Sequence, residues 1–475
     1  MDASQITSLR PALDRYLAEF DDCFGRVEPS KHFGTYVRGQ LSDLPRKSIE
    51  PIALQAGAPP RTLQQFLSRA YWQEGTMRER LQEIVARDHA HPHAVGIFDE
   101  TSYAKKGDKT PGVKRQHCGT TGKTDNCCVS VHLGYATPDG FHALLDGELF
   151  LPEDWSADRQ RCRACGIPEA MVHRPKGDIA LELLDRAVAN GVRFPWLTFD
   201  EGYGQSPAFL HALDDRGQLY VAEVPRCFTG WCKKPPLLHK EHHAHGPGHG
   251  RNGRPRIFPR LAAAAPRASA VDDLCRYSPV FTAQAWQALH VKDTTRGPAV
   301  WRVKAAPFHL KRDGRPTRRH WLIIAQNVLD EAEVKYFVSN APPGTPLEVM
   351  LHVAFSRWPV ERCFQDQKTE LGLDHFEVRN YRSLMRHLTL TAVSFLFLAK
   401  TTRERRGEKS GPDALPGPHR RERDDPIVAD AWAAPAGVSS AAGGNSRLHS
   451  SPQRHRQPMP PTGDDQKPSR VGHCN

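Results

Sequence analysis

The chain has 475 residues, which is enough for two to four folding units. Hydrophobic residues make up 39% and charged residues 25%, so the composition excludes a fully disordered chain and allows at least one sizeable core. Lys and Arg outnumber Asp and Glu by 65 to 54, and the net charge of +11 favours a polyanionic partner over a small acidic metabolite. A generally basic surface without such a partner is the alternative.

Membrane and export signals are absent from the pattern of the sequence. The most apolar stretch, residues 388–400, is shorter than the roughly 20 residues that cross a bilayer and contains Thr and Ser. The first 20 residues lack the apolar segment of a signal peptide. Eleven cysteines, an odd number without regular pairing, favour reduced thiols. We therefore expect a cytoplasmic protein with no membrane partner.

Residues 1–90 are predicted to be helical. Apolar side chains recur at helical spacing in residues 10–20, and residues 48–72 have the outline of two helices joined by a Gly-Ala-Pro-Pro turn. This outline suits a helix-turn-helix domain in which Arg61 and Arg69 face a DNA groove. An ordinary helical hairpin is the alternative.

Residues 91–224 alternate between predicted strands and helices, which indicates a mixed sheet with helices on its faces. The predicted strands are 94–98, 127–135, 141–149, 196–199 and 218–224, and the predicted helices are 179–189 and 206–213. Residues 225–345 open with a His- and Pro-rich passage and contain predicted strands at 299–305, 320–326 and 334–338. We expect this stretch to be a β-rich insertion, with helical sequence resuming over residues 346–400.

The composition changes at about residue 401. Pro, Gly and Ser make up a third of residues 401–475, whereas Leu, Ile, Val and Phe together number six. Such a segment cannot bury enough apolar area to offset its chain entropy, so we predict that it is disordered. Its composition also fits GC-rich DNA translated out of frame, which makes a frameshifted tail a further hypothesis.

Two acids end apolar runs that are predicted to be buried strands. Asp99 follows Val-Gly-Ile-Phe, and Asp200 follows Trp-Leu-Thr-Phe. Carboxylates at the ends of adjacent core strands bring hard oxygen ligands together, as Mg²⁺ and Mn²⁺ require. Each acid taken alone is explained better as the cap of a turn than as a metal ligand.

A third acid lies in a predicted helix. Pro359 fits the first turn of that helix, Glu361 follows it, and Lys368 lies two turns further along the same face. Such a helix can present one oxygen to a metal and one cation to a phosphate. Composition alone allows a solvated helix face instead.

Three segments in this order resemble DDE-superfamily transposases of insertion sequences. They are FDETSYAKKGDKTPGVKRQHCGTTGKTDNC, LTFDEGYG and RWPVERCFQDQK. Arg357, Glu361 and Lys368 match the R, E and K of the Y-x2-R-x3-E-x6-K pattern that marks one branch. The Tyr position holds Ala354, and the neighbouring Phe355 is expected to supply the aromatic surface.

The resemblance implies an α/β fold with an RNase-H-like mixed-sheet catalytic core, interrupted by the β-rich insertion. It implies an enzyme that cuts and joins DNA strands at the ends of an insertion sequence by metal-dependent hydrolysis and transesterification. Asp99, Asp200 and Glu361 would be the catalytic residues and would bind two Mg²⁺ ions per active site, with Mn²⁺ as a substitute. No nucleotide cofactor is expected, because the GTTGK run lacks P-loop spacing.

The resemblance also implies a DNA-binding surface around these acids. Arg357 and Lys368 would contact phosphate near the scissile bond. The approach to the site would be lined by Lys105, Lys106, Lys114, Arg115 and Lys123. The expected partners are double-stranded DNA, both element ends and target, and a second copy of the chain in the DNA complex. The expected location is a bacterial cytoplasm, at the nucleoid when DNA is bound.

Several features of the sequence allow other interpretations. A catalytically inactive DNA-binding protein derived from such an element is the main alternative. Glu100, Glu201 and Glu370 are rival acids, which the R-x3-E-x6-K spacing and the strand ends disfavour. The cysteine pairs 162/165 and 227/232 lack regular zinc spacing, and the histidines of residues 239–249 are predicted to lie in a solvated loop.

Overall fold

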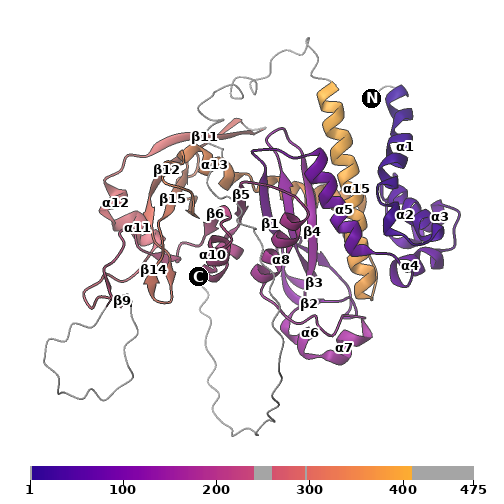
Figure 1. The fold of residues 1–475 in the computed structure, drawn as a ribbon, viewed down its shortest axis with the longest axis horizontal. Helices are drawn as coiled ribbons and strands as arrows, with labels where there is room; N and C mark the ends of the chain where they lie inside the picture. The colour runs from indigo at the N-terminus through magenta and orange to yellow at the C-terminus, as the bar shows by residue number, and fades with distance from the viewer. Residues whose placement is uncertain (1–2, 240–258, 295–296, 409–475) are drawn as a thin grey trace, which may run out of the picture. The chain divides into compact units, whose positions relative to one another are not determined.

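The computed structural model describes residues 3–239, 259–294 and 297–408, and these residues contain one large mixed sheet (Figure 1). The order of its strands is β11-β12-β15-β16-β6-β5-β1-β3-β2, and β4 pairs with β3. These strands are β1 (Val95–Ala104), β2 (Lys114–Cys118), β3 (Lys123–Ala136), β4 (His142–Phe150), β5 (Trp196–Phe199), β6 (Leu219–Val224), β11 (Gln287–Thr294), β12 (Gly297–Phe308), β15 (His320–Asn327) and β16 (Val334–Ser339).

Strand direction changes at the centre of the sheet. β1 is antiparallel to β3, which is antiparallel to β2 and β4, whereas β1, β5 and β6 are parallel to one another. The strands of residues 225–345 continue the same sheet, because β16 pairs antiparallel with β6 through Tyr336 and Val224. The predicted β-rich insertion therefore contributes strands to the sheet that carries β1 and β5.

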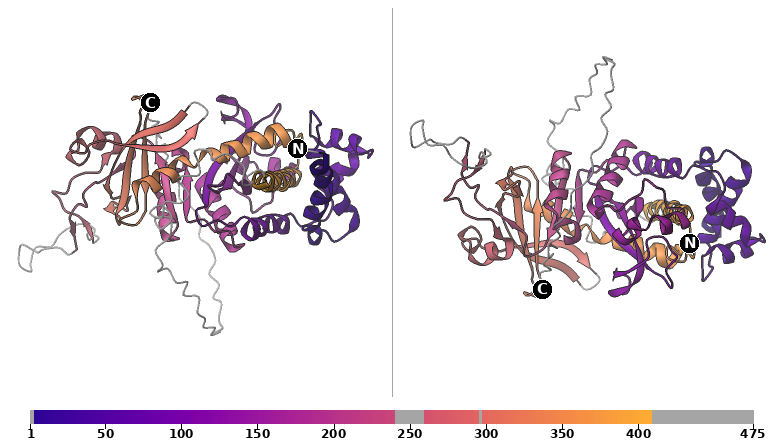
Figure 2. Two further views of the ribbon diagram at one scale, coloured as in Figure 1. Left: turned by 90° about the horizontal axis from the view of Figure 1, so that it is seen from above. Right: turned by 90° about the horizontal axis from the view of Figure 1, so that it is seen from below.

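Helices cover both faces of this sheet, as the mixed α/β prediction requires (Figure 2). Strand alternation sends Phe98 and Phe199 to one face, where they belong to the same core as residues of α8 (Lys176–Ala189) and α10 (Pro207–Asp215). Ile97 points to the opposite face and belongs to the core formed with α13 (Leu347–Phe355) and α14 (Trp358–Leu371). The strands are therefore apolar on both faces.

The N-terminal part is helical, as predicted. Its helices are α1 (Ala3–Ala18), a short 3₁₀ turn (Asp21–Cys23), α2 (Val27–Gln40), α3 (Ile49–Gln55), α4 (Pro60–Ser68) and α5 (Glu74–Asp88). The turn between α3 and α4 contains Gly57 at a φ of +64°, a backbone conformation that glycine adopts without strain. Both helices expected within residues 48–72 are present.

The long helix α15 (Tyr381–Glu408) packs against these N-terminal helices through buried polar contacts. Gln40 donates to the Thr391 hydroxyl at 2.8 Å and accepts from the Ser394 hydroxyl at 2.8 Å. The Thr and Ser residues of the most apolar stretch are therefore satisfied inside the protein. Among the described helices, none has the length and apolar character to cross a bilayer.

The helical stretch after residue 346 forms three helices, and Gly372, which adopts a φ of +70°, ends the second of them, α14. One predicted boundary needs correction. The change predicted at residue 401 falls inside α15, which continues to Glu408. Arg403 extends the packed part of this helix by pairing with Asp139 at 2.7 Å and by contacting His89 Nδ1 at 2.9 Å. The remainder of the predicted disordered tail, residues 409–475, lies outside the described residues.

Smaller elements complete the described part of the chain. They are helices α6 (Glu153–Ala157), α7 (Arg159–Ala164), α9 (Glu201–Gly204), α11 (Val271–Tyr277) and α12 (Pro279–Thr282), and the two-residue strands β7 (Thr229–Gly230), β8 (Leu237–Leu238), β9 (Arg260–Leu261), β10 (Ser269–Ala270), β13 (Lys311–Arg312) and β14 (Arg315–Pro316). The edge strand β11 was not predicted from the sequence, because its polar residues, Gln287, His290, Lys292 and Asp293 among them, hide the strand pattern.

Candidate active site

Asp99 lies on β1, and Asp200 directly follows the neighbouring parallel strand β5. Phe98 of β1 and Phe199 of β5 are register partners, and each acid is the next residue along the chain. Adjacent strands are about 4.8 Å apart, so the two acids start from the same level of the sheet. Asp200 caps α9, and its Oδ1 accepts from the Gly202 amide at 3.0 Å. The two strands are therefore adjacent, which is the condition that the sequence argument for two neighbouring acids required.

The strand that carries Asp99 is longer than predicted. The sequence suggested that the strand ends at Asp99, but β1 continues to Ala104. The reason is its antiparallel partner β3, which pairs with β1 from Val95 to Ala104 and satisfies the backbone of the polar residues. Asp99 thus lies in mid-strand, at the level where the neighbouring strand β5 has ended.

Glu361 lies in the first turn of α14, as the position of Pro359 predicted. Arg357, the residue that precedes this helix, extends its guanidinium between two of the acids. Its Nη1 lies 3.0 Å from Asp99 Oδ2, and its Nη2 lies 2.7 Å from Glu361 Oε1. The Asp99 side chain is 10% exposed, whereas that of Glu361 is 48% exposed. One guanidinium therefore joins residues that are 262 positions apart in the chain.

Burial and crowding of negative charge set the electrostatics of this group. Burial raises the pKa of Asp99 to about 7, although Arg357 acts to lower it, and Asp200 and Glu361 add to the rise. Burial also raises the pKa of Asp200, against the lowering effect of Arg357. Burial by itself would lower the pKa of Arg357, but Asp99, Glu361 and Asp200 reverse the direction. All three acids therefore act on the same cation.

The rival acids are placed differently. The side chain of Glu100, one residue after Asp99 on the strand, pairs with Lys176 of α8 at 2.6 Å. Glu201 and Glu370 have exposed side chains. Arg357 forms its ion pairs with Asp99 and Glu361, whereas Glu100 pairs with Lys176.

Lys368 is half-buried against the loop between β2 and β3. Its ammonium donates to the Thr120 hydroxyl at 2.8 Å and to the Ser102 carbonyl at 3.1 Å. Burial lowers the pKa of Lys368. The predicted basic side chain is thus on the same helix as Glu361, and Thr120 is a contact that the sequence did not suggest.

The remaining predicted DNA contacts fall into two groups. Lys105 donates to the carbonyls of Asp374 at 2.9 Å and Phe376 at 2.7 Å, so its ammonium ties β1 to the segment after α14. Exposed side chains make up the other group, and Lys114 within it pairs with Asp154 at 3.2 Å. The exposed members are Lys106, Lys114, Arg115, Lys123, Arg61 and Arg69.

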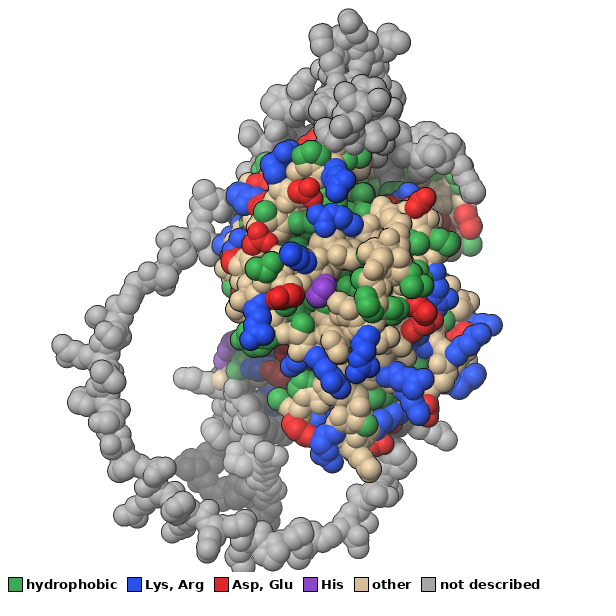
Figure 3. Space-filling model, turned by 90° about the vertical axis from the view of Figure 1, so that its right-hand side faces the viewer, with side chains coloured by type: hydrophobic (Ala, Val, Ile, Leu, Met, Phe, Trp, Pro, Cys, Tyr) green, Lys and Arg blue, Asp and Glu red, His purple; other side chains and the backbone are tan. Residues whose placement is uncertain are grey.

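Arg61 and Arg69 belong to the N-terminal helical region. On the face that Figure 3 presents, Lys and Arg side chains are spread among Asp and Glu side chains. They do not form a single basic stripe there. Charge distribution on this face therefore gives no separate support to the helix-turn-helix hypothesis.

The aromatic side chains near α14 differ from the prediction. Phe355 packs against Trp301, with ring centroids 4.8 Å apart, and against Phe337 at 5.7 Å. It therefore belongs to the packing of α13 on the sheet. Trp358, the residue after Arg357, is 55% exposed and was not singled out from the sequence. The feature of the sequence that could have drawn attention to Trp358 is its position directly before Pro359.

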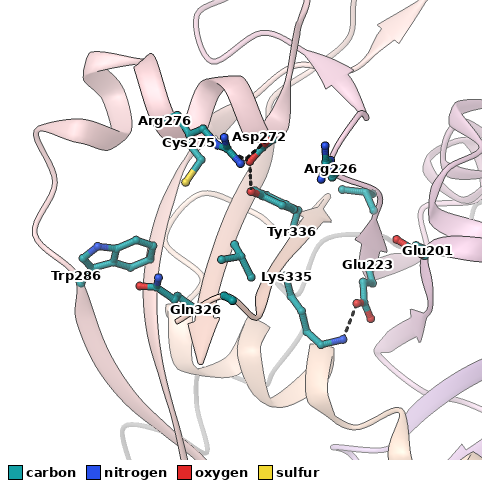
Figure 4. Close-up of a pocket in the computed structure, with 13 residues that line it drawn as sticks. Glu201, Glu223, Arg226, Asp272, Cys275, Arg276, Trp286, Gln326, Lys335 and Tyr336 are labelled. Carbon is teal, nitrogen blue, oxygen red and sulfur yellow. Dashed lines mark hydrogen bonds and ion pairs between the residues drawn. The ribbon is translucent and has the colours of Figure 1, made fainter. Parts of the chain in front are cut away.

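A cavity of about 400 Å³ is lined by residues of β6, α11, β15 and β16 together with Glu201 (Figure 4). Glu201, which follows Asp200, and Glu223, which acts on the pKa of Arg357, both line it. Within the cavity, Lys335 pairs with Glu223 at 2.6 Å and Tyr336 donates to Asp272 at 2.8 Å. Glu223 is a further acid near the site that the sequence did not reveal.

Carboxylate oxygens are the ligands that a hard divalent ion such as Mg²⁺ or Mn²⁺ prefers. Asp99, Asp200 and Glu361 fit such an ion in charge and ligand type, with the Arg357 guanidinium between Asp99 and Glu361. As the side chains stand, no three His, Cys, Asp or Glu residues in the described ranges are grouped to hold a metal ion. Metal binding would therefore require the acids to exchange the guanidinium for the ion.

The cysteine pairs that had a loosely zinc-like spacing are placed in packing positions. Cys162 and Cys165 lie in a small apolar core with Trp155, and the Cys162 thiol donates to the Trp155 carbonyl at 3.0 Å. Cys227 is exposed and Cys232 is half-buried. Apart from His239, the histidines of the predicted solvated loop lie outside the described residues.

Comparison with known proteins places the chain in a family. The family model of the DDE superfamily endonuclease matches residues 19–298, which is more than half of the chain. The chain therefore belongs to the DDE superfamily endonuclease family. Asp99 and Asp200 lie inside the matched range, and Glu361 lies beyond it.

The chain is also similar to a protein of Microchaete diplosiphon described as "Probable transposase for insertion sequence element IS701". The two are 30% identical over 214 residues, which make up 45% of this chain and 53% of the relative. The match thus spans about half the length of that relative.

Proposed function

We propose that this protein is the transposase of an insertion sequence, which cuts DNA at the element's ends and joins the ends to a target. The observation that carries the proposal is that Arg357 bridges Asp99 and Glu361, while Asp200 follows the strand β5 that pairs with β1 beside Asp99. Family membership and the similarity to the IS701 relative support it. Target and end sequences are not part of the proposal.

The topology supports an RNase-H-like core for this activity. Antiparallel strands β4, β3 and β1 are followed in the sheet by the parallel strands β5 and β6, with helices on both faces. In the proposed organisation, residues 1–90 bind DNA, residues 91–224 and 346–400 form the catalytic core, and residues 225–345 are inserted between them. Helix α15 continues this core to Glu408, and we propose that the tail after it results from a frameshift.

Asp99, Asp200 and Glu361 are the proposed ligands of two Mg²⁺ ions, which Mn²⁺ can replace. When bound, such ions activate the attacking water or 3′-hydroxyl and stabilise the leaving oxygen. Strand β1 and the end of β5 hold Asp99 and Asp200 rigidly, and the first turn of α14 presents Glu361. Hydrolysis and transesterification by this route need no covalent bond between protein and DNA.

The chain's cations hold the substrate in this proposal. Arg357 and Lys368 contact phosphates next to the scissile bond. Their positive charges also offset the repulsion between these phosphates and the acids. Exposed basic side chains on β2, β3 and the adjoining loop extend the surface, and contacts of this kind give salt-dependent affinity. The exposed members of that set are Lys106, Lys114, Arg115 and Lys123.

Joining two element ends requires that both be held together, so the working form is a dimer on double-stranded DNA. The proposed setting is the bacterial cytoplasm, at the nucleoid. An inactive DNA-binding derivative of such an element is the second candidate. It is favoured by one observation, the replacement of the pattern's Tyr by the buried residue Ala354.

The test is DNA cleavage by variants of the three acids. Asp99→Asn, Asp200→Asn and Glu361→Gln should each abolish Mg²⁺-dependent nicking of a duplex carrying the inverted repeats that flank the gene. Glu370→Gln is the matched control, since it removes an exposed carboxylate from the same helix, and should cut like the parent. Cleavage at the parental rate by any of the three variants would remove that residue from the site, and an inactive parent would favour the second candidate.

A further inference from the structure

The guanidinium of Arg357 holds the oxygens that a metal ion would need. Asp99 Oδ2 faces Arg357 Nη1 at 3.0 Å, while Asp99 Oδ1 accepts from the Glu100 amide at 2.8 Å. Glu361 Oε1 faces Arg357 Nη2 at 2.7 Å. Both oxygens of Asp99 and one of Glu361 are therefore engaged within the protein.

Buried acids of like charge need a cation in the same place. Asp99 is 7% exposed, and Asp200 and Glu361 both act on it electrostatically. Removing such charges from water is costly unless an opposite charge is present, and a two-pronged guanidinium meets two carboxylates at once. Arg357 thus provides, from within the chain, the positive charge that this cluster requires.

A divalent ion and the guanidinium cannot both occupy the space between Asp99 and Glu361, because their charges repel at short range. The Arg357 side chain is 27% exposed, so it has a route towards solvent. DNA brings phosphates to this surface in the proposed function, and a phosphate is a good bidentate partner for a guanidinium.

Resting on that proposed function, we propose that Arg357 is a built-in counter-ion that competes with the divalent metal for Asp99 and Glu361. Metal entry releases the guanidinium, and a DNA phosphate receives it. Metal and DNA then bind cooperatively, because each favours the arrangement that the other needs. In the absence of DNA, Arg357 weakens metal binding.

The experiment measures Mn²⁺ affinity by calorimetry, with no dependence on catalysis. Arg357→Gln should bind Mn²⁺ at least about tenfold more tightly than wild type without DNA, since the competing charge is gone. Adding a duplex should tighten Mn²⁺ binding by wild type and change binding by Arg357→Gln much less. Arg362→Gln is the matched control, because Arg362 pairs with Asp366 on the exposed side of the same helix and should leave Mn²⁺ affinity unchanged.

Arg357→Lys is a second variant, which tests the same inference if Arg357→Gln fails to fold. A lysine keeps the positive charge but cannot bridge both carboxylates, so an increase in Mn²⁺ affinity in the same direction is expected. The rise in melting temperature on Mn²⁺ addition provides a second readout and should be larger in both Arg357 variants than in wild type.

The outcomes separate this inference from the proposed function. Equal or weaker Mn²⁺ binding by the Arg357 variants, with Asp99-dependent binding by wild type, overturns the inference and leaves the proposed function standing. If neither wild type nor the Arg357 variants bind Mn²⁺ in a way that Asp99→Asn abolishes, the proposed metal site fails and the inference fails with it.

Discussion

Asp99 and Glu100 are adjacent acids with different surroundings, and the difference comes from strand alternation. Asp99 meets Arg357 on one face of β1, whereas Glu100 meets Lys176 of α8 on the other. A sequence motif that contains both acids cannot distinguish them by composition. Their partners lie 258 and 76 positions away, so the choice between them depends on tertiary packing.

His387 shows how burial acts on a single titratable group. Its Nδ1 lies 2.9 Å from the Tyr36 hydroxyl, and its Nε2 lies 3.1 Å from the Leu373 carbonyl, so the neutral ring satisfies both partners. Burial lowers the pKa of His387 to about 4 from an ordinary value of 6.5. The unfolded chain therefore takes up this proton at a higher pH than the folded protein does.

The stability that depends on His387 is fully present above pH 6.5 and is lost as the pH falls towards 4. We expect His387→Gln, which can still bond to Tyr36 and Leu373, to remove this dependence. Relative to the variant, wild type should lose up to about 3 kcal/mol of unfolding free energy over this interval. Urea denaturation at pH 7 and pH 4.5 measures the difference.

His117→Gln is the control for that measurement, because His117 lies exposed on β2. It should keep the pH dependence of wild type. An unchanged slope in His387→Gln would mean that the buried ring is not neutral in the folded protein.

One buried arginine of helix α15 makes several of the contacts that attach this helix to the N-terminal helices. Arg386 donates to the carbonyls of Phe66, Leu67 and Ala70 at the end of α4, and to that of Trp72 at 3.1 Å. The last carbonyls of a helix have no partner within it, so this side chain satisfies them from another element. Its Nε also pairs with Glu74 at 2.7 Å.

Arg386→Met should lower the unfolding free energy by about 3 kcal/mol, since it leaves several buried carbonyls without a donor. Arg382→Met, on the exposed side of the same helix, should change it by less than about 0.5 kcal/mol. Thermal and urea unfolding of the two variants measure the contrast. Similar losses in both would show that the buried contacts are not what secures α15.

Among the helices and strands, hydrophobic periodicity predicted most central strands and the N-terminal helices, because apolar runs reflect burial directly. It missed the continuation of β1 past Asp99, where pairing with β3 rather than apolar content maintains the strand. It also missed the edge strand β11. Local pattern cannot report pairing partners.

At the scale of the whole molecule, the sheet brings together acids from three distant segments. The order of motifs selects these acids as the proposed site, and the parallel register of β1 and β5 accounts for the neighbouring positions of two of them. The position of Arg357 between Asp99 and Glu361 could not be predicted, because the motif assigns that residue to DNA. The joining of the 225–345 strands to the same sheet through β16 and β6 was also beyond the pattern of the sequence.

We propose that Asp99, Asp200 and Glu361 bind the metal ions that support DNA cleavage. The metal dependence of cleavage by Asp99→Cys tests this directly. A thiolate is a poor ligand for Mg²⁺ and a better one for the softer Mn²⁺. We expect no cleavage by this variant in Mg²⁺ and partial recovery in Mn²⁺, whereas cleavage at the parental rate in Mg²⁺ would show that Asp99 is not a metal ligand.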